Sequence, residues 1–392
     1  MRIAVASSGL GHVARGVESW ASDLGRALAD RGVASILVRG GGPPSEGIER
    51  LVSCLRRGSS GNQRMLAALP AWATWRIGLS TPYGVEQVSF AAGLVRLLRR
   101  ERVDVLHVQD PGVALLVRKA SRLGLCRTRV ILANGTDEPL DFLSRFEFVQ
   151  HLAPAHVEEA RAAGTWRPGW TMIPNFVDAN AFRPGSGVEA RRELGIPLEA
   201  RVVFTAAAIK RDHKRIDYLV AEFRRMLDQR PALDAYLVVA GGRETQTDGV
   251  IAEARTLLGD RVRFLVDHPR ERMPALYQAA DVFVLCSLKE MISIALLEAT
   301  ASGLPCIVST HPVVSWAAGP GGESIAMEET GALALAMGRL LEDPAALARR
   351  ALASRRHCLD HFETDRVVDQ IQDYYQFVAT RGRLAAQVET SR

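Results

Sequence analysis

Two glutamates, Glu290 and Glu298, are spaced so that both could hold hydroxyl groups of a single ligand. Across Met291–Thr310, Glu298 is the only charged residue, and the helix expected around it is apolar on almost every side. A carboxylate buried there loses much of its solvation free energy unless hydrogen-bond donors replace the water. Ligand hydroxyls are one source of donors, and neighbouring protein groups are the other. The pattern therefore indicates either a hydroxyl-binding or a structural glutamate.

Glu290 follows a predicted strand, Val282–Cys286, and precedes the helix that carries Glu298. In an open α/β sheet, ligands bind outside the carboxyl ends of the strands. The helix start at Ser293–Leu296 offers free backbone amides and the positive end of the helix dipole to an anion. This strand–loop–helix segment therefore predicts two carboxylates and an anion-binding row of amides within the length of one ligand.

A second strand end is basic. Four cations fall within six positions after the predicted strand Val202–Ala206: Lys210, Arg211, Lys214 and Arg215. A helix dipole favours acids at such a start, so cations there indicate a bound anion, and a diphosphate suits their number. Two of the chain's four lysines lie here, although chance also explains that clustering. A solvated basic helix start remains the alternative interpretation.

The loop Gly9–Ala14, between a predicted strand and a helix, matches the G-x-G-x-x-A pattern of dinucleotide-binding loops. It favours a rival class, an NADP-dependent oxidoreductase, because Arg39 ends the second strand where the ribose would be bound. The glycines also allow a donor phosphate or an acceptor to approach the backbone closely. His107 and Asp110 follow the strand Val103–Val108 and are further candidates, although packing explains a lone histidine equally well.

Strand-like and helix-like runs alternate along the whole chain, which is typical of parallel α/β architecture. A length of 392 residues suits two domains, and proline and glycine concentrate at Phe182–Gly187. We therefore expect an N-terminal domain over 1–182 and a C-terminal domain over 183–363, followed by a closing helix. The stretch Gly40–Pro82 shows no regular pattern.

The expected strands are continuous apolar runs, as parallel strands buried on both faces should be. They are Ile3–Ala6, Ser35–Val38, Val103–Val108, Arg129–Ala133, Val202–Ala206, Ala235–Ala240, Val262–Val266, Val282–Cys286 and Cys306–Ser309. The clearest helices are Val85–Arg100, Ala114–Arg122, Ala345–Cys358 and Thr364–Ala379.

The composition argues against several classes of protein. No apolar run is long enough to span a membrane, and the chain starts on a strand without a signal sequence, so we expect a cytoplasmic protein. Five scattered cysteines indicate neither disulfides nor a metal site. Basic residues are not interleaved with aromatic ones, which argues against nucleic acid as a partner. A net charge of +5 leaves peripheral contact with the inner membrane face open, for example through Arg56, Arg57, Arg99, Arg100 and Arg102.

Taken together, these motifs resemble the retaining glycosyltransferases of the GT-B fold, family four, over nearly the whole chain. The resemblance rests on the E-x7-E pair Glu290/Glu298, Lys210–Lys214 before Asp217-Tyr218-Leu219, Ile173–Asp178 with Phe182, Ala280–Leu285, Ala301–Pro305, and Gly11-His12 before Glu18. It implies an α/β fold of two Rossmann-like parallel-sheet domains facing across a cleft, with the C-terminal helix 364–392 packing back on the N-terminal domain. It also implies transfer of a sugar from a nucleoside diphosphate to a hydroxyl acceptor, with retention and without a metal or other cofactor.

The resemblance also implies roles for individual residues. The implied catalytic residues are His107, Lys210, Lys214 and Glu290, with the lysines neutralising the diphosphate and Glu290 binding sugar hydroxyls. Glu298 would bind the ribose, and stabilisation of the departing diphosphate by cations would replace a metal ion. The implied donor-binding residues are Gly11, His12, Arg211, Met291, Ile292, Ser293, Ile294 and Glu298.

Two positions depart from the family pattern. The family commonly reads E-x-F-G after the first glutamate, whereas here Ser293 adds a side chain where the donor sugar would lie. Family members often carry an H-x-H segment near the acceptor, and here Gln109 takes the second position. A non-catalytic nucleotide-sugar-binding relative therefore stays open beside the NADP oxidoreductase. The identities of the acceptor, which we expect Gly40–Pro82 to determine, and of the donor stay open, as does the oligomeric state.

Overall fold

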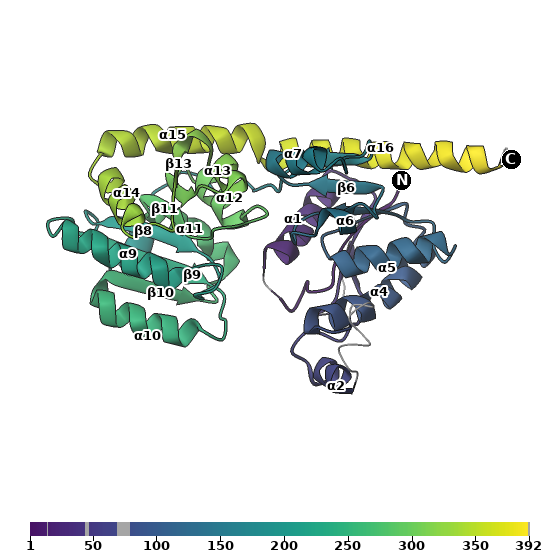
Figure 1. Ribbon diagram of the computed structural model, residues 1–392, viewed down its shortest axis with the longest axis horizontal. Coiled ribbons are helices and arrows are strands. Elements are labelled where there is room, and N and C mark those ends of the chain that lie inside the picture. The colour runs from purple at the N-terminus through teal and green to yellow at the C-terminus, as the bar shows by residue number, and fades with distance from the viewer. Residues whose placement is uncertain (14, 44–46, 69–78, 391–392) are drawn as a thin grey trace. The chain divides into compact units, whose positions relative to one another are not determined.

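The chain divides into two compact units, which we call the N-terminal and C-terminal domains (Figure 1). The N-terminal domain comprises Met1–Ile173 and Val367–Arg392, and the C-terminal domain comprises Pro174–Arg366. The predicted domain boundaries, 1–182 and 183–363, stay predictions, because compact units in a structure are not a test of which segments fold independently. The computed structural model describes residues 1–13, 15–43, 47–68 and 79–390, with the backbone alone for 382–390.

The N-terminal domain is built on a seven-stranded parallel sheet of order β3-β2-β1-β4-β5-β6-β7. The strand order reverses at β1, which pairs with β2 on one side and β4 on the other. Every residue of β1 and β4 is buried, as expected for strands covered on both faces. The strands are β1 Ile3–Ser7, β2 Ser35–Arg39, β3 Glu49–Leu51, β4 Val105–Val108, β5 Arg129–Ala133, β6 Phe148–His151 and β7 Trp170–Met172.

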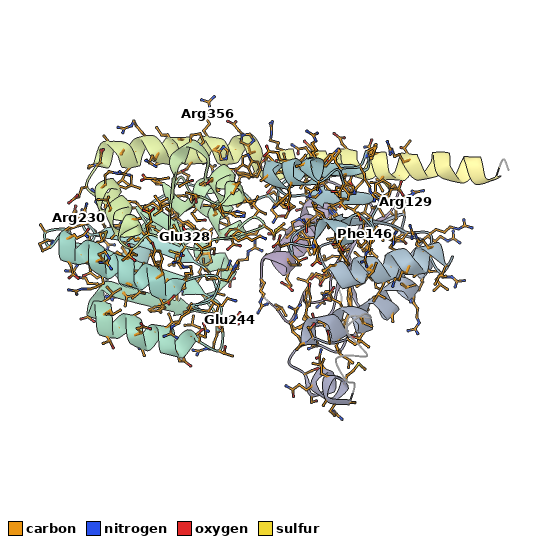
Figure 2. All side chains as sticks on the ribbon, viewed as in Figure 1. Arg129, Phe146, Arg230, Glu244, Glu328 and Arg356 are labelled. Atoms are coloured by element: carbon orange, nitrogen blue, oxygen red, sulfur yellow. The ribbon has the colours of Figure 1, made fainter. Side chains whose placement is uncertain are left out.

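Helices connect these strands, and the last helix of the chain belongs mostly to the same domain. Tyr374 Oη donates a hydrogen bond to Gly169 O at 2.6 Å, and Arg129 Nη1 donates to Ala379 O at 3.3 Å, so α16 is fixed to this sheet (Figure 2). The helices are α1 Gly16–Asp30, α2 Ser60–Ala68, α4 Pro82–Arg100, α5 Pro111–Arg122, α6 Leu140–Leu143, α7 Pro154–Ala162 and α16 Thr364–Thr390.

The C-terminal domain carries a six-stranded parallel sheet of order β10-β9-β8-β11-β12-β13. Its strand order reverses at β8, which pairs with both β9 and β11. The strands are β8 Arg201–Ala206, β9 Ala235–Gly241, β10 Val262–Val266, β11 Val282–Leu285, β12 Cys306–Ser309 and β13 Gly322–Ile325. The α-helices are α8 Val188–Glu193, α9 Ile216–Gln229, α10 Thr247–Leu258, α11 Met273–Ala279, α12 Ile294–Ala301, α13 Pro312–Ala318, α14 Ala332–Leu341 and α15 Pro344–His361.

The prediction of two Rossmann-like parallel sheets is confirmed, and the sequence missed only short elements. The strands β3, β6, β7 and β13 have three or four residues each, too few for a periodic pattern. The stretch Gly40–Pro82, predicted to be irregular, contains β3 and α2. Residues 44–46 and 69–78 of that stretch, Ala14 of the glycine loop and residues 391–392 of the closing helix lie outside the described residues.

Candidate active site

The predicted diphosphate lysine and sugar glutamate meet at the point where the C-terminal sheet reverses its strand order. Lys214 follows β8 and Glu290 follows β11, and these two strands are neighbours. Lys214 Nζ donates a short hydrogen bond to Glu290 Oε1, although 76 positions separate them in sequence. Their side chains are 20% and 11% exposed. The pair therefore occupies the place where ligands bind in open α/β sheets.

The loop before α9 has a strained backbone on both sides of Lys214. His213 and Arg215, on either side of it, have φ angles of +60° and +53°. Such angles cost residues other than glycine roughly 1 kcal/mol or more each, so surrounding contacts must maintain them. Arg215 donates to Met327 O at 3.1 Å and its guanidinium lies 4.1 Å from the centre of the Tyr218 ring. These contacts fix the direction in which Lys214 leaves the loop.

Two further basic residues lie around this ion pair. His213 Nε2 is 3.7 Å from Glu290 Oε1. Burial lowers the pKa of His213, and the positive charges of Lys214 and Lys210 lower it further, against the opposing effect of Glu290. The charge of Lys210 therefore acts on His213, the chain neighbour of Lys214, and the role of Lys210 in neutralising a diphosphate stays a prediction. His213 was missed, because one exposed histidine in a basic segment gives no signal of its own.

Arg211, another predicted donor-binding residue, is engaged elsewhere. Its guanidinium donates to Glu253 Oε2 on α10 at 2.6 Å, and its backbone amide donates to Gln246 Oε1 at 2.9 Å. The structure therefore does not bring the Arg211 side chain to the Lys214–Glu290 pair, and its role in donor binding stays a prediction.

The segment Met291–Ile294 forms the loop end and the first turn of α12. Ser293 is the N-cap, and its Oγ accepts a hydrogen bond from Leu296 N at 3.4 Å. The side chain that departs from the family pattern is thus used to begin the helix. Ile292 is buried, whereas Met291 and Ile294 are partly exposed. The first amides of α12 point out of the helix end, where an anion could accept hydrogen bonds from them.

Glu298 lies in the middle of α12 with 6% of its surface exposed. Its Oε2 accepts a hydrogen bond at 2.8 Å from the hydroxyl of Tyr277, a fully buried residue of α11. Burial and the charge of Glu298 raise the pKa of Tyr277 well above its usual value, so the phenol stays a donor. Arg270 Nη2 is 3.9 Å from the other carboxylate oxygen. Protein groups therefore supply donors to Glu298, and its binding of a ribose stays a prediction.

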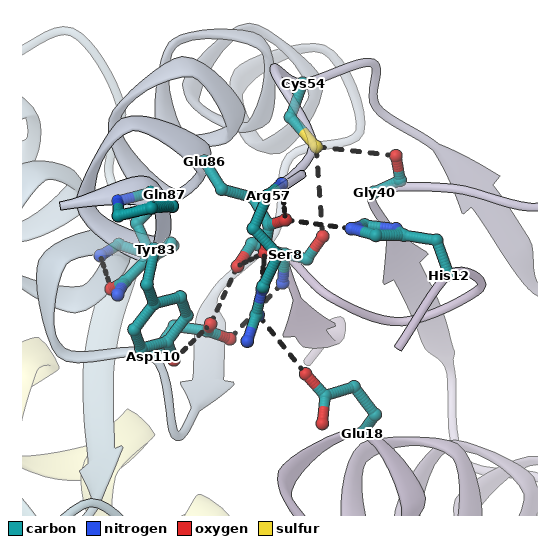
Figure 3. Close-up of polar contacts among 12 residues, drawn as sticks. Ser8, His12, Glu18, Gly40, Cys54, Arg57, Tyr83, Glu86, Gln87 and Asp110 are labelled. Carbon is teal, nitrogen blue, oxygen red and sulfur yellow. Dashed lines mark hydrogen bonds and ion pairs between the residues drawn. The ribbon is translucent and has the colours of Figure 1, made fainter. Parts of the chain in front are cut away.

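The N-terminal sheet also carries polar residues where its strand order reverses (Figure 3). Ser8 follows β1 and Asp110 follows β4, and Ser8 Oγ donates to Asp110 Oδ1 at 2.8 Å. Tyr83 Oη donates to the same oxygen at 2.8 Å. We call this group and its surroundings the N-terminal polar cluster, which consists of Ser8, His12, Glu18, Arg57, Tyr83, Glu86 and Asp110.

Arg57 and Glu86 form the centre of the N-terminal polar cluster. Glu86 is fully buried on α4, and Arg57 donates to it from Nη2 at 2.7 Å, from Nε at 3.0 Å and from the backbone at 2.7 Å. His12 Nε2 lies 2.8 Å from the second oxygen. Burial favours the neutral acid, but these hydrogen bonds outweigh it and lower the pKa of Glu86. Arg57 Nη2 also reaches Glu18 Oε1 at 3.4 Å (Figure 3).

Sequence reasoning missed four members of this cluster as binding residues: Ser8, Arg57, Tyr83 and Glu86. Glu86 did give a signal, because it is an acid within the apolar stripe of a predicted helix, as Glu298 is. Arg57 gave none, since it lies in the stretch Gly40–Pro82 that could not be assigned.

Glu18 predicts a pH dependence of stability. Burial, together with the charge of Asp110, raises the pKa of Glu18 from 4.5 to about 7. The folded state therefore binds a proton that the unfolded state releases, so stability falls as pH rises from about 4.5 to about 7. We expect Glu18→Gln to stabilise the chain by up to about 3 kcal/mol at about pH 8 and by little at about pH 4.5.

Urea denaturation followed by tryptophan fluorescence tests this, because five of the six tryptophans belong to the N-terminal domain. Asp23→Asn, a change at a partly exposed acid on the same helix, is the control and should leave the pH profile unchanged. Equal pH profiles for wild type and Glu18→Gln would contradict the raised pKa.

The glycine loop does not form the NADP site that one alternative required. Arg39 is 5% exposed, donates to Gly41 O at 2.7 Å and to Pro43 O at 2.6 Å, and pairs with Glu49 at 2.9 Å. It is therefore not available for a ribose phosphate. Gly11 has φ +93°, and a Cβ on it would lie 2.2 Å from Gly41 O, so its contact with the protein itself requires a glycine. The roles of Gly11 and His12 in donor binding stay predictions.

His107 lies inside the N-terminal domain rather than in the N-terminal polar cluster. It is fully buried in β4, its Nδ1 is 2.8 Å from Tyr375 Oη, and Trp20 contacts the ring edge-on. Burial lowers its pKa to about 3, which keeps the imidazole neutral. The structure does not bring His107 to the other predicted site residues, and its catalytic role stays a prediction without geometric support.

Within the part of the chain that the structure describes, no group of three His, Cys, Asp or Glu side chains is arranged to hold a metal ion. No described helix combines the length and the apolar character that crossing a bilayer requires. All five cysteines are free thiols, and only Cys54 is not buried.

Comparison with known sequences gives two family matches and many relatives. The model described as "Glycosyltransferase Family 4" matches residues 14–180, and "Glycosyl transferases group 1" matches residues 199–343. A D-inositol 3-phosphate glycosyltransferase of Salinispora tropica is 31% identical over 261 residues, which are 62% of this chain and 50% of the relative. The chain thus aligns with about half the length of the curated relatives it matches.

Solved structures with the same fold cover nearly the whole chain. Sucrose-phosphate synthase from Thermosynechococcus elongatus has a TM-score of 0.76 at 20% identity, covering 97% of this chain and 99% of that one. HepE from Anabaena, in complex with UDP and glucose, has a TM-score of 0.72 at 16% identity, covering 96% and 99%. At these identities the likeness establishes the GT-B fold. With its two sheets and both family matches, the chain has the GT-B fold and belongs to glycosyltransferase family four.

Proposed function

We propose that this glycosyltransferase takes a sugar from a nucleoside diphosphate donor and transfers it to a hydroxyl acceptor with retention of configuration. The observation that carries the proposal is the Lys214–Glu290 ion pair at the strand-order reversal of the C-terminal sheet. A lysine for phosphate and a carboxylate for sugar hydroxyls stand side by side there, beside the first amides of α12. The nucleotide in the HepE structure supports this choice of donor.

The Lys214–Glu290 pair suits a donor that carries both groups. Without a donor, each side chain neutralises the other and keeps it in place while half-buried. A diphosphate offers Lys214 a more strongly charged partner, which frees Glu290 to accept hydrogen bonds from the sugar. As the sugar–phosphate bond breaks, negative charge grows on the diphosphate, and Lys214 and Lys210 stabilise it. The retaining outcome rests on the family resemblance.

The acceptor side of the proposal is the N-terminal polar cluster. It lies at the strand-order reversal of the N-terminal sheet, the position equivalent to that of the donor pair. Asp110 is fully buried, and burial raises its pKa. Glu18 Oε2 is buried without a hydrogen-bond partner among the described residues, so an acceptor hydroxyl could donate to it.

Donor binding and donor turnover test the proposal in turn. A thermal-shift screen against UDP, GDP, ADP and TDP and their sugars identifies the nucleotide. Release of nucleoside diphosphate, measured first by slow hydrolysis and then with a panel of hydroxyl acceptors, identifies turnover. Tight binding without any turnover would instead favour the non-catalytic relative, and no binding to any donor would contradict the proposal.

Metal chelation provides a further prediction. Because Lys214 and Lys210 would neutralise the leaving diphosphate, we expect excess EDTA to leave donor turnover within about twofold of the untreated enzyme. Addition of Mg²⁺ after dialysis should raise turnover by no more than the same factor. A loss of about tenfold or more on chelation, restored by a divalent cation, would contradict the assignment of charge stabilisation to the lysines.

A further inference from the structure

An apolar groove of about 470 Å3 lies between helices α4 and α5 of the N-terminal domain. Val88 on α4, Leu116 on α5 and Leu125 after α5 line it. Its charged lining residues are Arg96 and Arg99, both on the last turns of α4. Nothing in the donor site or the N-terminal polar cluster uses these side chains, so the groove needs a separate explanation.

Two exposed leucines extend the apolar surface at one end of the groove. Leu123 is 77% exposed and Leu125 is 49% exposed, among the largest values for apolar side chains in the described residues. A single exposed leucine is ordinary, but Leu125 lines the apolar groove itself and Leu123 stands only two residues before it, so the two add exposed apolar surface near one patch. Such patches mark surfaces that leave water on binding a partner.

The chain around the groove is strongly basic. Only three acidic residues lie between Val88 and Arg127, and none of them neutralises a cation of the groove. Asp110 is fully buried, Glu101 pairs with Arg2 at 2.5 Å, and Asp104 accepts a hydrogen bond from the Arg2 amide at 2.7 Å. The basic residues of the same span are eight, namely Arg96, Arg99, Arg100, Arg102, Arg118, Lys119, Arg122 and Arg127.

Two cations that line the groove and two more at the end of α5 have no acidic partner among the residues that the structure describes. Among the described residues, Arg96, Arg99, Lys119 and Arg122 form no ion pair with any acid. Lys119 and Arg122 lie on the last turn of α5, the helix that also carries the lining residues Leu116 and Ala120. Burial, and then the charge of Arg122, lower the pKa of Arg118, another residue of α5, as expected where positive charges repel one another. An anionic partner would relieve that repulsion.

We propose that this face, the α4–α5 groove with its basic rim and the two leucines, docks the protein on an anionic phospholipid bilayer. Lipid phosphates would pair with the rim cations, while Leu123, Leu125 and the groove would take up acyl-chain surface. A second copy of the chain is disfavoured, because a symmetric contact would set this positive face against itself. Arg57, one of the arginines that the sequence suggested for membrane contact, is not part of this face, because its guanidinium is hydrogen-bonded to Glu86.

Vesicle sedimentation of the full chain, without donor or acceptor, tests the proposal. We expect binding to vesicles with about 30% phosphatidylglycerol and little binding to pure phosphatidylcholine, with the binding lost at high salt. Arg96→Glu/Arg99→Glu should weaken it by about 30-fold or more, since each basic residue contributes a factor of about five. Leu123→Ser/Leu125→Ser should also weaken vesicle binding, but the dependence of binding on salt concentration should stay the same as in the wild type.

The matched control reverses two charges on α15 of the C-terminal domain. Arg349→Glu/Arg356→Glu changes the net charge equally, on side chains that are exposed (Figure 2 labels Arg356), and should bind within about twofold of wild type. Equal weakening by both pairs of substitutions would reduce the effect to net charge and overturn the docking face. Equal binding of the wild type to both kinds of vesicle, or binding to neither kind, would also overturn it. In the latter case, a dimer that Arg96→Glu/Arg99→Glu dissociates would identify a second copy of the chain as the partner. Nucleoside diphosphate release is a separate measurement, so failure here leaves the proposed function intact.

Discussion

Replacement of Lys214 by methionine should lower release of nucleoside diphosphate by about 10²- to 10³-fold, with the fold unchanged. Methionine keeps most of the side-chain volume but removes the charge that would stabilise the leaving diphosphate, and loss of one such preorganised group has costs of this size. Lys214 is only 20% exposed, so water replaces its ammonium poorly. Initial rates at saturating donor, with circular dichroism as the folding check, measure the effect.

A matched control uses an ion pair of the same domain that faces solvent. Arg224 on α9 is 49% exposed and pairs with Asp228, so Arg224→Met should keep wild-type turnover. The double variant Lys214→Met/Glu290→Gln should lose less than the product of the two single losses, because the residues contact one another. Wild-type turnover in folded Lys214→Met would contradict the site, whereas absence of turnover in wild type would contradict the function.

The position of Lys214 and Glu290 at one edge of a sheet could be predicted from sequence, because the signals are local. Lys214 and Glu290 each follow an apolar strand, and parallel strands place such ends along one edge of a sheet. That the two strands are neighbours depends on the order β8-β11, which follows from long-range pairing and is not encoded near either residue. Ser293 could not be explained by comparison with the family motif alone. Its hydroxyl caps the N-terminus of α12, and only the structure shows that contact.

The N-terminal half was harder to predict for physical reasons. Arg57 reaches Glu86 across 29 positions from a segment without periodicity, so no local pattern could pair them. His107 shows a second limit of sequence reasoning, because a histidine at the end of a strand has the same local sequence whether it faces a ligand or the core. Tyr375, which contacts His107, lies 268 positions later. Contacts of that separation decide which polar residues are accessible to a substrate.

Substitution of Glu86 by alanine should destabilise the N-terminal domain by about 3–5 kcal/mol, because it leaves a charged guanidinium without its partner in a half-buried site. Arg57 would lose three hydrogen bonds to one carboxylate, while the Tyr83 ring, 4.3 Å from the guanidinium, still prevents full hydration. Urea denaturation followed by tryptophan fluorescence measures the change. Asp369→Ala, which breaks a pair between Arg31 and an acid that is 72% exposed, is the control in the same domain and should cost less than about 1 kcal/mol.

The double variant Arg57→Met/Glu86→Leu separates a structural role of this pair from a role in binding. Replacing both charges by apolar groups of similar size removes the unpaired guanidinium, so most of the stability lost in Glu86→Ala should return. If the N-terminal polar cluster binds the acceptor, this stable variant should not transfer sugar to an acceptor. Slow hydrolysis of the donor should continue, because Lys214 and Glu290 are intact. Restored stability together with restored transfer would instead mean that Arg57 and Glu86 only hold the loop in place.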